Sequence, residues 1–143
     1  MNKDVREKIS KALSMNVSYD TNYQLLSNAL FTIKALRNAT AHNNIVFDAR
    51  YKDRNVNKNI IRWVETEVGI TNVKFDYFSD YIALIVCVLK RVHYPKKMLK
   101  RFLKEYEECI NDLYNLLPLA IYNKIVATGI KGKLVKLSEY IAK

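Results

Sequence analysis

Glycine and proline are scarce in this chain of 143 residues, which contains three glycines and two prolines. Because these residues form many tight turns, their scarcity favours helices joined by few such turns. The sequence also lacks internal repeats and low-complexity segments, and half of its residues are hydrophobic. We therefore expect a single domain, residues 1–143, with one hydrophobic core.

Cysteine is equally rare, and neither Cys87 nor Cys109 belongs to a Cys-x-x-Cys motif or a His–Cys cluster that could hold a metal ion. Both lie in segments with apolar periodicity, so we expect buried free thiols in a reducing cytosol. The sequence also lacks a DxD, HxxxE or P-loop pattern for metal-dependent or nucleotide-dependent phosphoryl transfer. We therefore expect no metal site and no cofactor.

Long apolar runs are absent as well. The longest, residues 81–89, has about half the length that a membrane span needs. The charged N-terminal segment lacks the apolar core of a signal peptide. These absences predict a cytoplasmic protein with no membrane partner.

Apolar residues recur at three- and four-residue steps along most of the chain, which is the period of amphipathic helices. A polar and basic connection, residues 43–59, interrupts this pattern, and Asp20, Gly69 and Pro95 are residue types that begin or end helices. The fold class that follows is an all-α, single-domain bundle of five to seven helices. The expected helices are 3–14, 20–42, 58–68, 77–93, 95–117, a short one within 118–129, and 134–142.

The most distinctive stretch closes the second expected helix, at residues 36–44, LRNATAHNN. Asn38 and His42 are four residues apart and share one helix face, while Arg37 must reach round with its long side chain. An imidazole with an ordinary pKa of about 6.5 suits proton transfer near neutral pH. A guanidinium can offset charge on a phosphoryl oxygen, so the pattern indicates chemistry on a phosphate. The structural alternative is a solvated Arg37, capping asparagines and a His42 favoured by the helix dipole.

Residues 25–47, LLSNALFTIKALRNATAHNNIVF, resemble the signature of the HEPN superfamily and, within it, of the Abi-like (abortive infection) proteins of bacteria and their phages. The shared motif is an Arg, a polar residue that is often Asn, three further residues and a His. It commonly lies inside a longer RN..AH string, which this chain reproduces. Abi-like proteins are commonly longer, with the motif in their second half, so we expect a short or partial member.

The resemblance implies an α-helical, metal-independent endoribonuclease of a phage-defence or toxin–antitoxin system. Arg37 would bind and polarise the scissile phosphate, Asn38 would position it or orient the Arg, and His42 would act on the ribose 2′-OH. In HEPN nucleases two domains pair and bring two motifs into one cleft. The resemblance therefore also implies a homodimer with a composite site, and an antitoxin or other regulatory protein is a further candidate partner.

Basic residues outnumber acidic ones by 24 to 14, which gives a formal net charge of +10. Several of the basic residues are clustered in the sequence. Clusters of basic side chains bind a phosphate backbone by releasing counterions, and neighbouring aromatic rings can stack on unpaired bases. We therefore expect RNA as a partner. The candidate residues are Lys97, Lys100, Arg101 and Lys104 on one helix face, Arg50, Lys52, Arg54, Lys58 and Arg62 in and after the connection, and the aromatic residues Tyr51, Phe75 and Tyr94.

Other interpretations remain open from these residues. The motif also suits a non-catalytic HEPN-like module that binds RNA or a protein, and the basic face suits a solvated surface with aromatics packed beneath it. A DNA-binding helical domain would use the same charge, although the sequence has no clear recognition helix after a glycine-containing turn. His93, the other histidine, precedes a Tyr-Pro pair and is expected to be a cap or a surface group.

Overall fold

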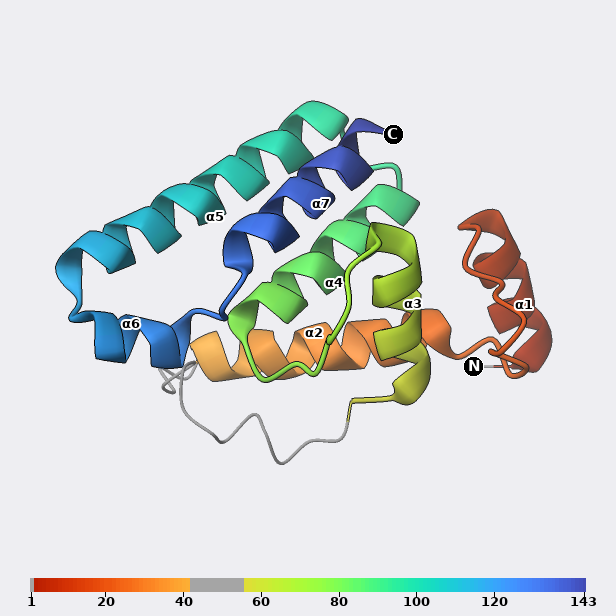
Figure 1. Cartoon of the computed structure of the whole chain (residues 1–143). Helices are drawn as coiled ribbons and strands as arrows, with labels where there is room; N and C mark the ends of the chain where they lie inside the picture. The colour runs from red at the N-terminus through yellow and green to blue at the C-terminus, as the bar shows by residue number, and fades with distance from the viewer. Residues whose placement is uncertain (1, 42–55) are drawn as a thin grey trace.

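The computed structural model describes residues 2–41 and 56–143 (Figure 1). These residues form seven α-helices and no strand, which confirms the expected all-α bundle. The helices are α1 (Lys3–Ala12), α2 (Leu25–Ala41), α3 (Lys58–Val68), α4 (Phe78–Arg91), α5 (Lys96–Leu116), α6 (Leu119–Ile125) and α7 (Ile130–Ala142).

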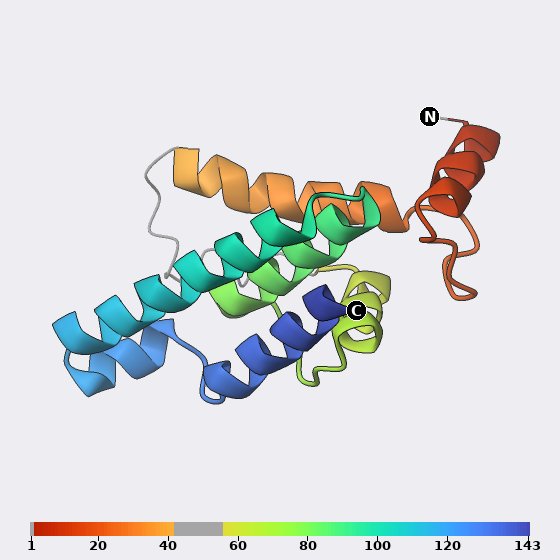
Figure 2. The same ribbon diagram turned by 90° about the horizontal axis from the view of Figure 1, so that it is seen from above.

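Helix α4 forms the centre of the core because it is apolar on nearly every side. Nine of its 14 residues are buried, and it packs against α2, α3, α5 and α7. Leu84 is fully buried in α4, and Trp63, Leu99 and Leu137 bring large apolar side chains from α3, α5 and α7 to the same core. Seen from above in Figure 2, α2 lies on one side of α4, and α3 and α7 lie on the other.

Helix α2 begins at Leu25, five residues after the expected start at Asp20. The Asp20 carboxylate accepts hydrogen bonds from the backbone N–H groups of Gln24, at 3.1 Å, and Leu25, at 2.7 Å. It therefore satisfies N–H groups at the start of α2 from across an intervening turn, as a buried capping side chain. Leu25, Ala29 and Leu36 turn toward the core from this helix.

The other boundaries follow the sequence pattern closely. Helix α3 has the predicted bounds, and Gly69 caps its C-terminal end. The φ of Gly69, +74°, is a left-handed conformation that glycine adopts without strain. Helix α7 begins at Ile130, four residues before its expected start. The prediction was too short because Ile130 already belongs to the buried stripe that continues through Leu134 and Leu137.

Helices α1 and α6 lie at the periphery. Ser10 is the buried residue of α1, and none of the residues of α6 is buried. In Figure 1 α1 lies beside the N-terminal end of α2, and α6 follows the end of α5. Within residues 2–41 and 56–143, none of the helices combines the length and the apolar character that a membrane span requires.

Candidate functional site

Arg37 projects from the last turns of α2 as an exposed side chain. Its Nη1 donates a hydrogen bond to Oδ1 of the half-buried Asn38 over 3.3 Å. The preceding residue, Leu36, is buried and anchors this turn to the core. The ion pairs formed among residues 2–41 and 56–143 do not include Arg37, so within that part of the chain its positive charge is not offset by a carboxylate.

Part of the predicted site cannot be placed beside this pair, and the approach of Arg37 to His42 therefore stays a prediction. The sequence candidates that lie outside the described residues are His42, Asn43, Asn44, Arg50, Tyr51, Lys52 and Arg54.

Arg37 continues an apolar stripe along α2. Leu26, Leu30, Ile33 and Arg37 follow one another at steps of four, three and four residues, so they share one helix face. Leu30 is 50% exposed, and Leu26 and Ile33 are half-buried. A guanidinium that can bind an anion therefore stands at the end of an uncovered apolar strip.

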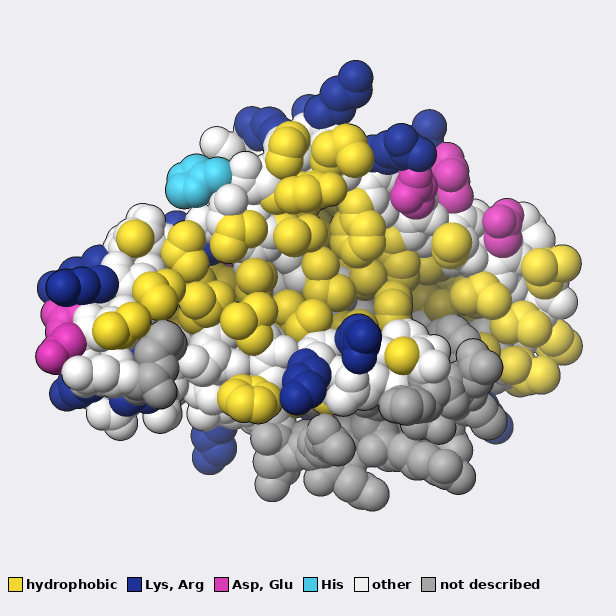
Figure 3. All heavy atoms as spheres, turned by 180° about the vertical axis from the view of Figure 1, so that it is seen from behind, with side chains coloured by type: hydrophobic (Ala, Val, Ile, Leu, Met, Phe, Trp, Pro, Cys, Tyr) yellow, Lys and Arg dark blue, Asp and Glu magenta, His cyan; other side chains and the backbone are white. Residues whose placement is uncertain are grey.

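The molecular surface around α2 and α5 extends this strip. Figure 3 views the molecule from behind and shows a broad apolar area across the middle of the face, with most charged side chains toward its margins. Exposed apolar side chains on these two helices and the turn before α5 include Leu30, Phe31, Tyr94 and Met98. An apolar area of this kind is typical of a surface that another molecule covers.

The predicted basic face of α5 is exposed, as its three- and four-residue spacing indicated. Lys97, Lys100, Arg101 and Lys104 all reach solvent from the first half of this helix. Two of the four, however, have an acidic neighbour one turn later. Arg101 Nε lies 2.8 Å from Glu105, and Lys104 Nζ lies 3.6 Å from Glu108. The two carboxylates make the net charge of this surface smaller than the count of its cations suggested. Because exposed ion pairs are weak, Arg101 and Lys104 can still contact another anion, and the surface remains basic.

The basic candidates do not gather into one patch among the described residues. Lys58 is exposed at the start of α3, at the bottom of Figure 1, whereas α5 lies at the top. The end of α2, which carries Arg37, is likewise separated from the first half of α5 along the bundle. The structure therefore unites Arg37 with Asn38 but leaves the α5 cations and Lys58 at separate places.

Two further cations, Lys90 and Arg91 at the end of α4, form contacts inside the fold. Arg91 pairs with Glu67 of α3, whose other carboxylate oxygen accepts the hydroxyl of Tyr140 at 3.0 Å. Lys90 donates to the backbone oxygen of Tyr140, and its ammonium lies 4.1 Å from the centre of that ring. Burial lowers the pKa of Lys90, and the nearby charges of Lys96 and Arg91 add to this effect. Lys90 and Arg91 thus join α4 to α3 and α7.

Phe75 was predicted to stack on RNA bases, and this prediction is wrong. Its side chain is only 2% exposed and packs edge-on against Tyr81, with 5.0 Å between the ring centres. Phe75 lies in the loop before α4, where no helical period could indicate its burial. Tyr94 is exposed, and so is His93, which lies just beyond α4 as the expected surface group.

The two cysteines also differ from the expectation that both are buried. Cys87 is fully buried in α4, and burial raises the pKa of its thiol, as does the negative charge of Glu67. Cys109 is exposed on α5. It lies off the buried stripe of Leu99, Leu103 and Ile110, so the apolar period of this amphipathic helix did not include it.

Comparison with known proteins adds no relative. No family model, curated protein or solved structure matches the chain. In the part of the chain that the structure describes, no three His, Cys, Asp or Glu side chains come together as a potential metal site. The functional interpretation therefore depends on the motif and on the geometry around it.

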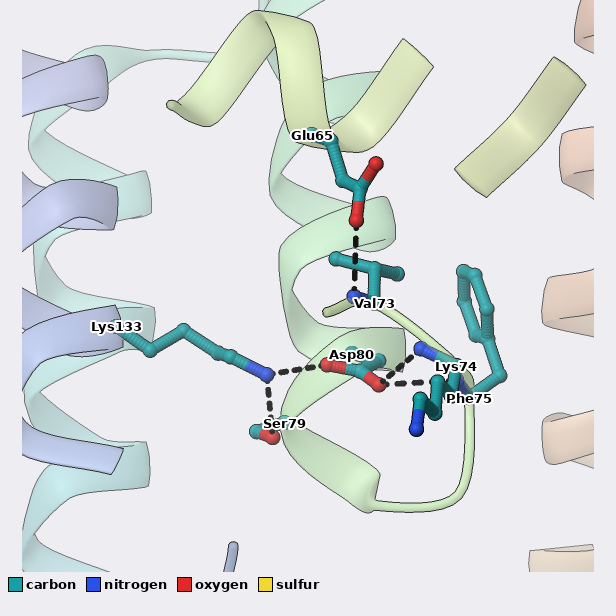
Figure 4. A network of polar contacts seen from close by, with 7 residues as sticks. All are labelled: Glu65, Val73, Lys74, Phe75, Ser79, Asp80 and Lys133. Atoms are coloured by element: carbon teal, nitrogen blue, oxygen red, sulfur yellow. Dashed lines mark hydrogen bonds and ion pairs between the residues drawn. The ribbon is translucent and has the colours of Figure 1, made fainter. Parts of the chain in front are cut away.

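A polar network that no sequence pattern revealed connects α3, α4, α7 and the loop before α4 (Figure 4). The buried Asp80 carboxylate pairs with Lys133 of α7 and accepts the backbone N–H groups of Lys74, at 3.1 Å, and Phe75, at 2.9 Å. Glu65 of α3 accepts the N–H of Val73 at 3.1 Å. Asp80 and Lys133 are 53 residues apart, so no local pattern could reveal their pairing.

Proposed function

We propose that this chain is a metal-independent endoribonuclease of a defence or toxin system that acts as a homodimer. The observation that carries the proposal is the Arg37–Asn38 pair. It presents an exposed guanidinium, with no carboxylate partner among the described residues, at the place where the motif requires a phosphate-binding group. A guanidinium binds two oxygens of a phosphate at once, and its planar fork gives this contact a defined orientation.

The proposed reaction uses the RNA's own 2′-hydroxyl as the nucleophile. The 2′ oxygen forms a bond to the adjacent phosphorus while His42 accepts its proton, and the bond from phosphorus to the 5′ oxygen breaks. The leaving oxygen takes up a proton, which gives a 2′,3′-cyclic phosphate and a 5′-hydroxyl. Arg37 offsets the negative charge that builds up on the phosphoryl oxygens, and Asn38 holds the guanidinium in place. DNA lacks the nucleophile and is not cleaved.

The apolar face of α2 supports the homodimer. The strip formed by Leu26, Leu30 and Ile33 leads directly to Arg37, and Leu30 is half exposed. The face of the molecule shown in Figure 3 has a broad apolar area. If a second copy covers this strip about a two-fold axis, each copy buries the same surface of the other. If the two-fold axis passes close to the Arg37 end of the strip, the two Arg37 side chains approach each other and both can reach a single strand of RNA.

The exposed cations of α5 and α3 support RNA affinity rather than chemistry. They would hold the phosphate backbone through contacts that do not depend on base sequence and that weaken as salt increases. Since these cations are separated from the end of α2, their removal should reduce binding while the reaction at bound RNA persists.

The decisive experiment is cleavage of a labelled, mixed-sequence RNA in excess EDTA, with analysis of the 3′ ends. We expect wild-type protein to give 2′,3′-cyclic phosphate ends, and Arg37→Ala and His42→Ala to lose at least about 100-fold in rate. Lys34→Ala, which removes an exposed cation from the same helix, is the matched control and should cleave at the wild-type rate. Intact RNA binding without cleavage by the wild type would instead support a non-catalytic RNA-binding module.

A further inference from the structure

A second polar region lies on the side of α4 that faces away from α2. The loop 69–77 and the start of α7 line an open cavity of about 840 Å³, a volume within the range of small-molecule sites. No residue of α2 lines this cavity, and in Figure 2 α4 lies between α2 and α7. The cavity is therefore distinct from the Arg37 region. Its polar lining includes Thr71, Asn72, Lys74, Thr128, Lys133 and Lys136.

The lining carries three ammonium groups, and their partners leave positive charge available. Lys133 is fixed by Asp80 and donates to the Ser79 hydroxyl at 3.3 Å (Figure 4). Lys136 pairs with Glu139 on its own helix, at 3.3 Å and with both side chains about half exposed, which is a weak interaction. Lys74 forms no ion pair with any described residue.

The acidic groups of the cavity do not offset this charge fully. Asp80 is buried, and its two oxygens already bind Lys133 and the backbone N–H groups of Lys74 and Phe75. Asp76 is exposed at the rim. Asp80 already occupies Lys133, and Glu139 pairs only weakly with Lys136 from outside the lining. Lys74 and Lys136 therefore keep hydrogen-bond donors available, which favours binding of an anion between them.

The rest of the lining suits a ligand larger than a free anion. Tyr77 is half-buried and offers an aromatic ring, and Ile70 and Ala127 add apolar surface. The wall includes Gly132, where an added Cβ would meet no atom within 4 Å, so a ligand can approach the backbone there. We propose that this cavity binds a small phosphate monoester of mononucleotide size, with its phosphate held by Lys74, Lys133 and Lys136.

Calorimetric titration of the full chain would test this site with four probes: AMP, ribose 5-phosphate, adenosine and inorganic phosphate. We expect AMP to bind and adenosine not to bind, since the phosphate supplies the main contacts. Tighter binding of AMP than of ribose 5-phosphate would assign the apolar part of the cavity to the base. Equal binding of these two would identify the sugar phosphate as sufficient, and binding of adenosine as well as AMP would overturn the proposal.

Variants locate the ligand within the molecule. Lys74→Ala and Lys136→Ala should each weaken AMP binding by about tenfold, because each removes one charged hydrogen bond. Both should fold normally, since the backbone N–H of Lys74 still bonds to Asp80 and Lys136 is exposed. Lys131→Ala, which removes an exposed cation of α7 outside the lining, is the control and should bind as wild type does.

Arg37→Ala separates this site from the proposed nuclease site. We expect the variant to bind AMP with unchanged affinity while it loses RNA cleavage. Loss of AMP binding in Arg37→Ala, or unchanged binding in both Lys74→Ala and Lys136→Ala, would overturn the location proposed here. Failure of the wild type to bind AMP at millimolar concentration would overturn the site altogether and would leave the nuclease proposal unaffected.

Discussion

Helices α2 and α4 pack against each other, yet they serve the molecule in different ways. Nine of the 14 residues of α4 are buried, whereas α2, with 17 residues, buries Leu25, Ala29 and Leu36. Apolar residues of α2 such as Leu30 remain exposed, and Arg37 stands among them. The comparison indicates that α4 stabilises the core and that α2 leaves apolar and charged side chains on the surface. Substitutions in the two helices should therefore separate folding from function.

The largest effect on stability is expected at the centre of α4. Leu84→Ala removes most of a fully buried side chain and should lower the free energy of unfolding by about 3 kcal/mol. Chemical denaturation monitored by circular dichroism would measure it. Leu30→Ala, the matched change in α2, should alter the free energy by less than about 0.5 kcal/mol, because this side chain is half exposed. Equal losses in the two variants would remove the distinction between the helices.

A smaller loss is expected when the partner of Asp80 is removed. Lys133→Ala leaves a buried carboxylate without its ammonium group and should destabilise the fold by about 2 kcal/mol, since two backbone N–H groups still bind Asp80. Lys136→Ala, which breaks an exposed pair on the same helix, should cost less than about 0.5 kcal/mol. Thermal unfolding of both variants would show the difference, and equal melting temperatures would contradict the role given to Asp80.

A substitution on the exposed face of α2 should change dimer formation and leave the stability of the monomer nearly unchanged. Leu30→Glu places a charge in the exposed apolar strip and should change the free energy of unfolding by less than about 0.5 kcal/mol. In the proposed homodimer, however, two charges would be buried without partners, so we expect monomers at micromolar concentration and loss of the proposed RNA cleavage. Light scattering and the cleavage assay measure the two effects. A Leu30→Glu variant that still dimerises and cleaves would exclude this strip as the interface.

The smallest expected effect is a difference in reactivity between the thiols of Cys87 and Cys109. Cys109 is exposed and should react with a thiol reagent in the native protein. Cys87 is buried in α4, and burial raises the pKa of its thiol, so it should stay unlabelled until the chain unfolds. Mass spectrometry would count the labels, and two labels on the folded protein would mean that α4 opens readily.

Local patterns predicted the helices well because the apolar period is a property of neighbouring residues. They failed where burial or pairing depends on distant segments. Phe75 has no helical period around it, and Lys133 reaches Asp80 only after α7 packs against α4. Asp20 was correctly identified as a capping residue, but its carboxylate acts across a turn, so the start of α2 was placed too early. The Arg37–Asn38 contact follows directly from their adjacency in the sequence.

The position of α7 in the fold has a consequence for the order of events during synthesis. This helix is made after the other six, yet Leu137 and Ile141 complete the core and Lys133 neutralises Asp80. A nascent chain that ends before α7 exposes one side of α4 and carries an uncompensated carboxylate, so it should be sensitive to proteolysis. The bundle should therefore reach its folded form only after α7 has emerged from the ribosome.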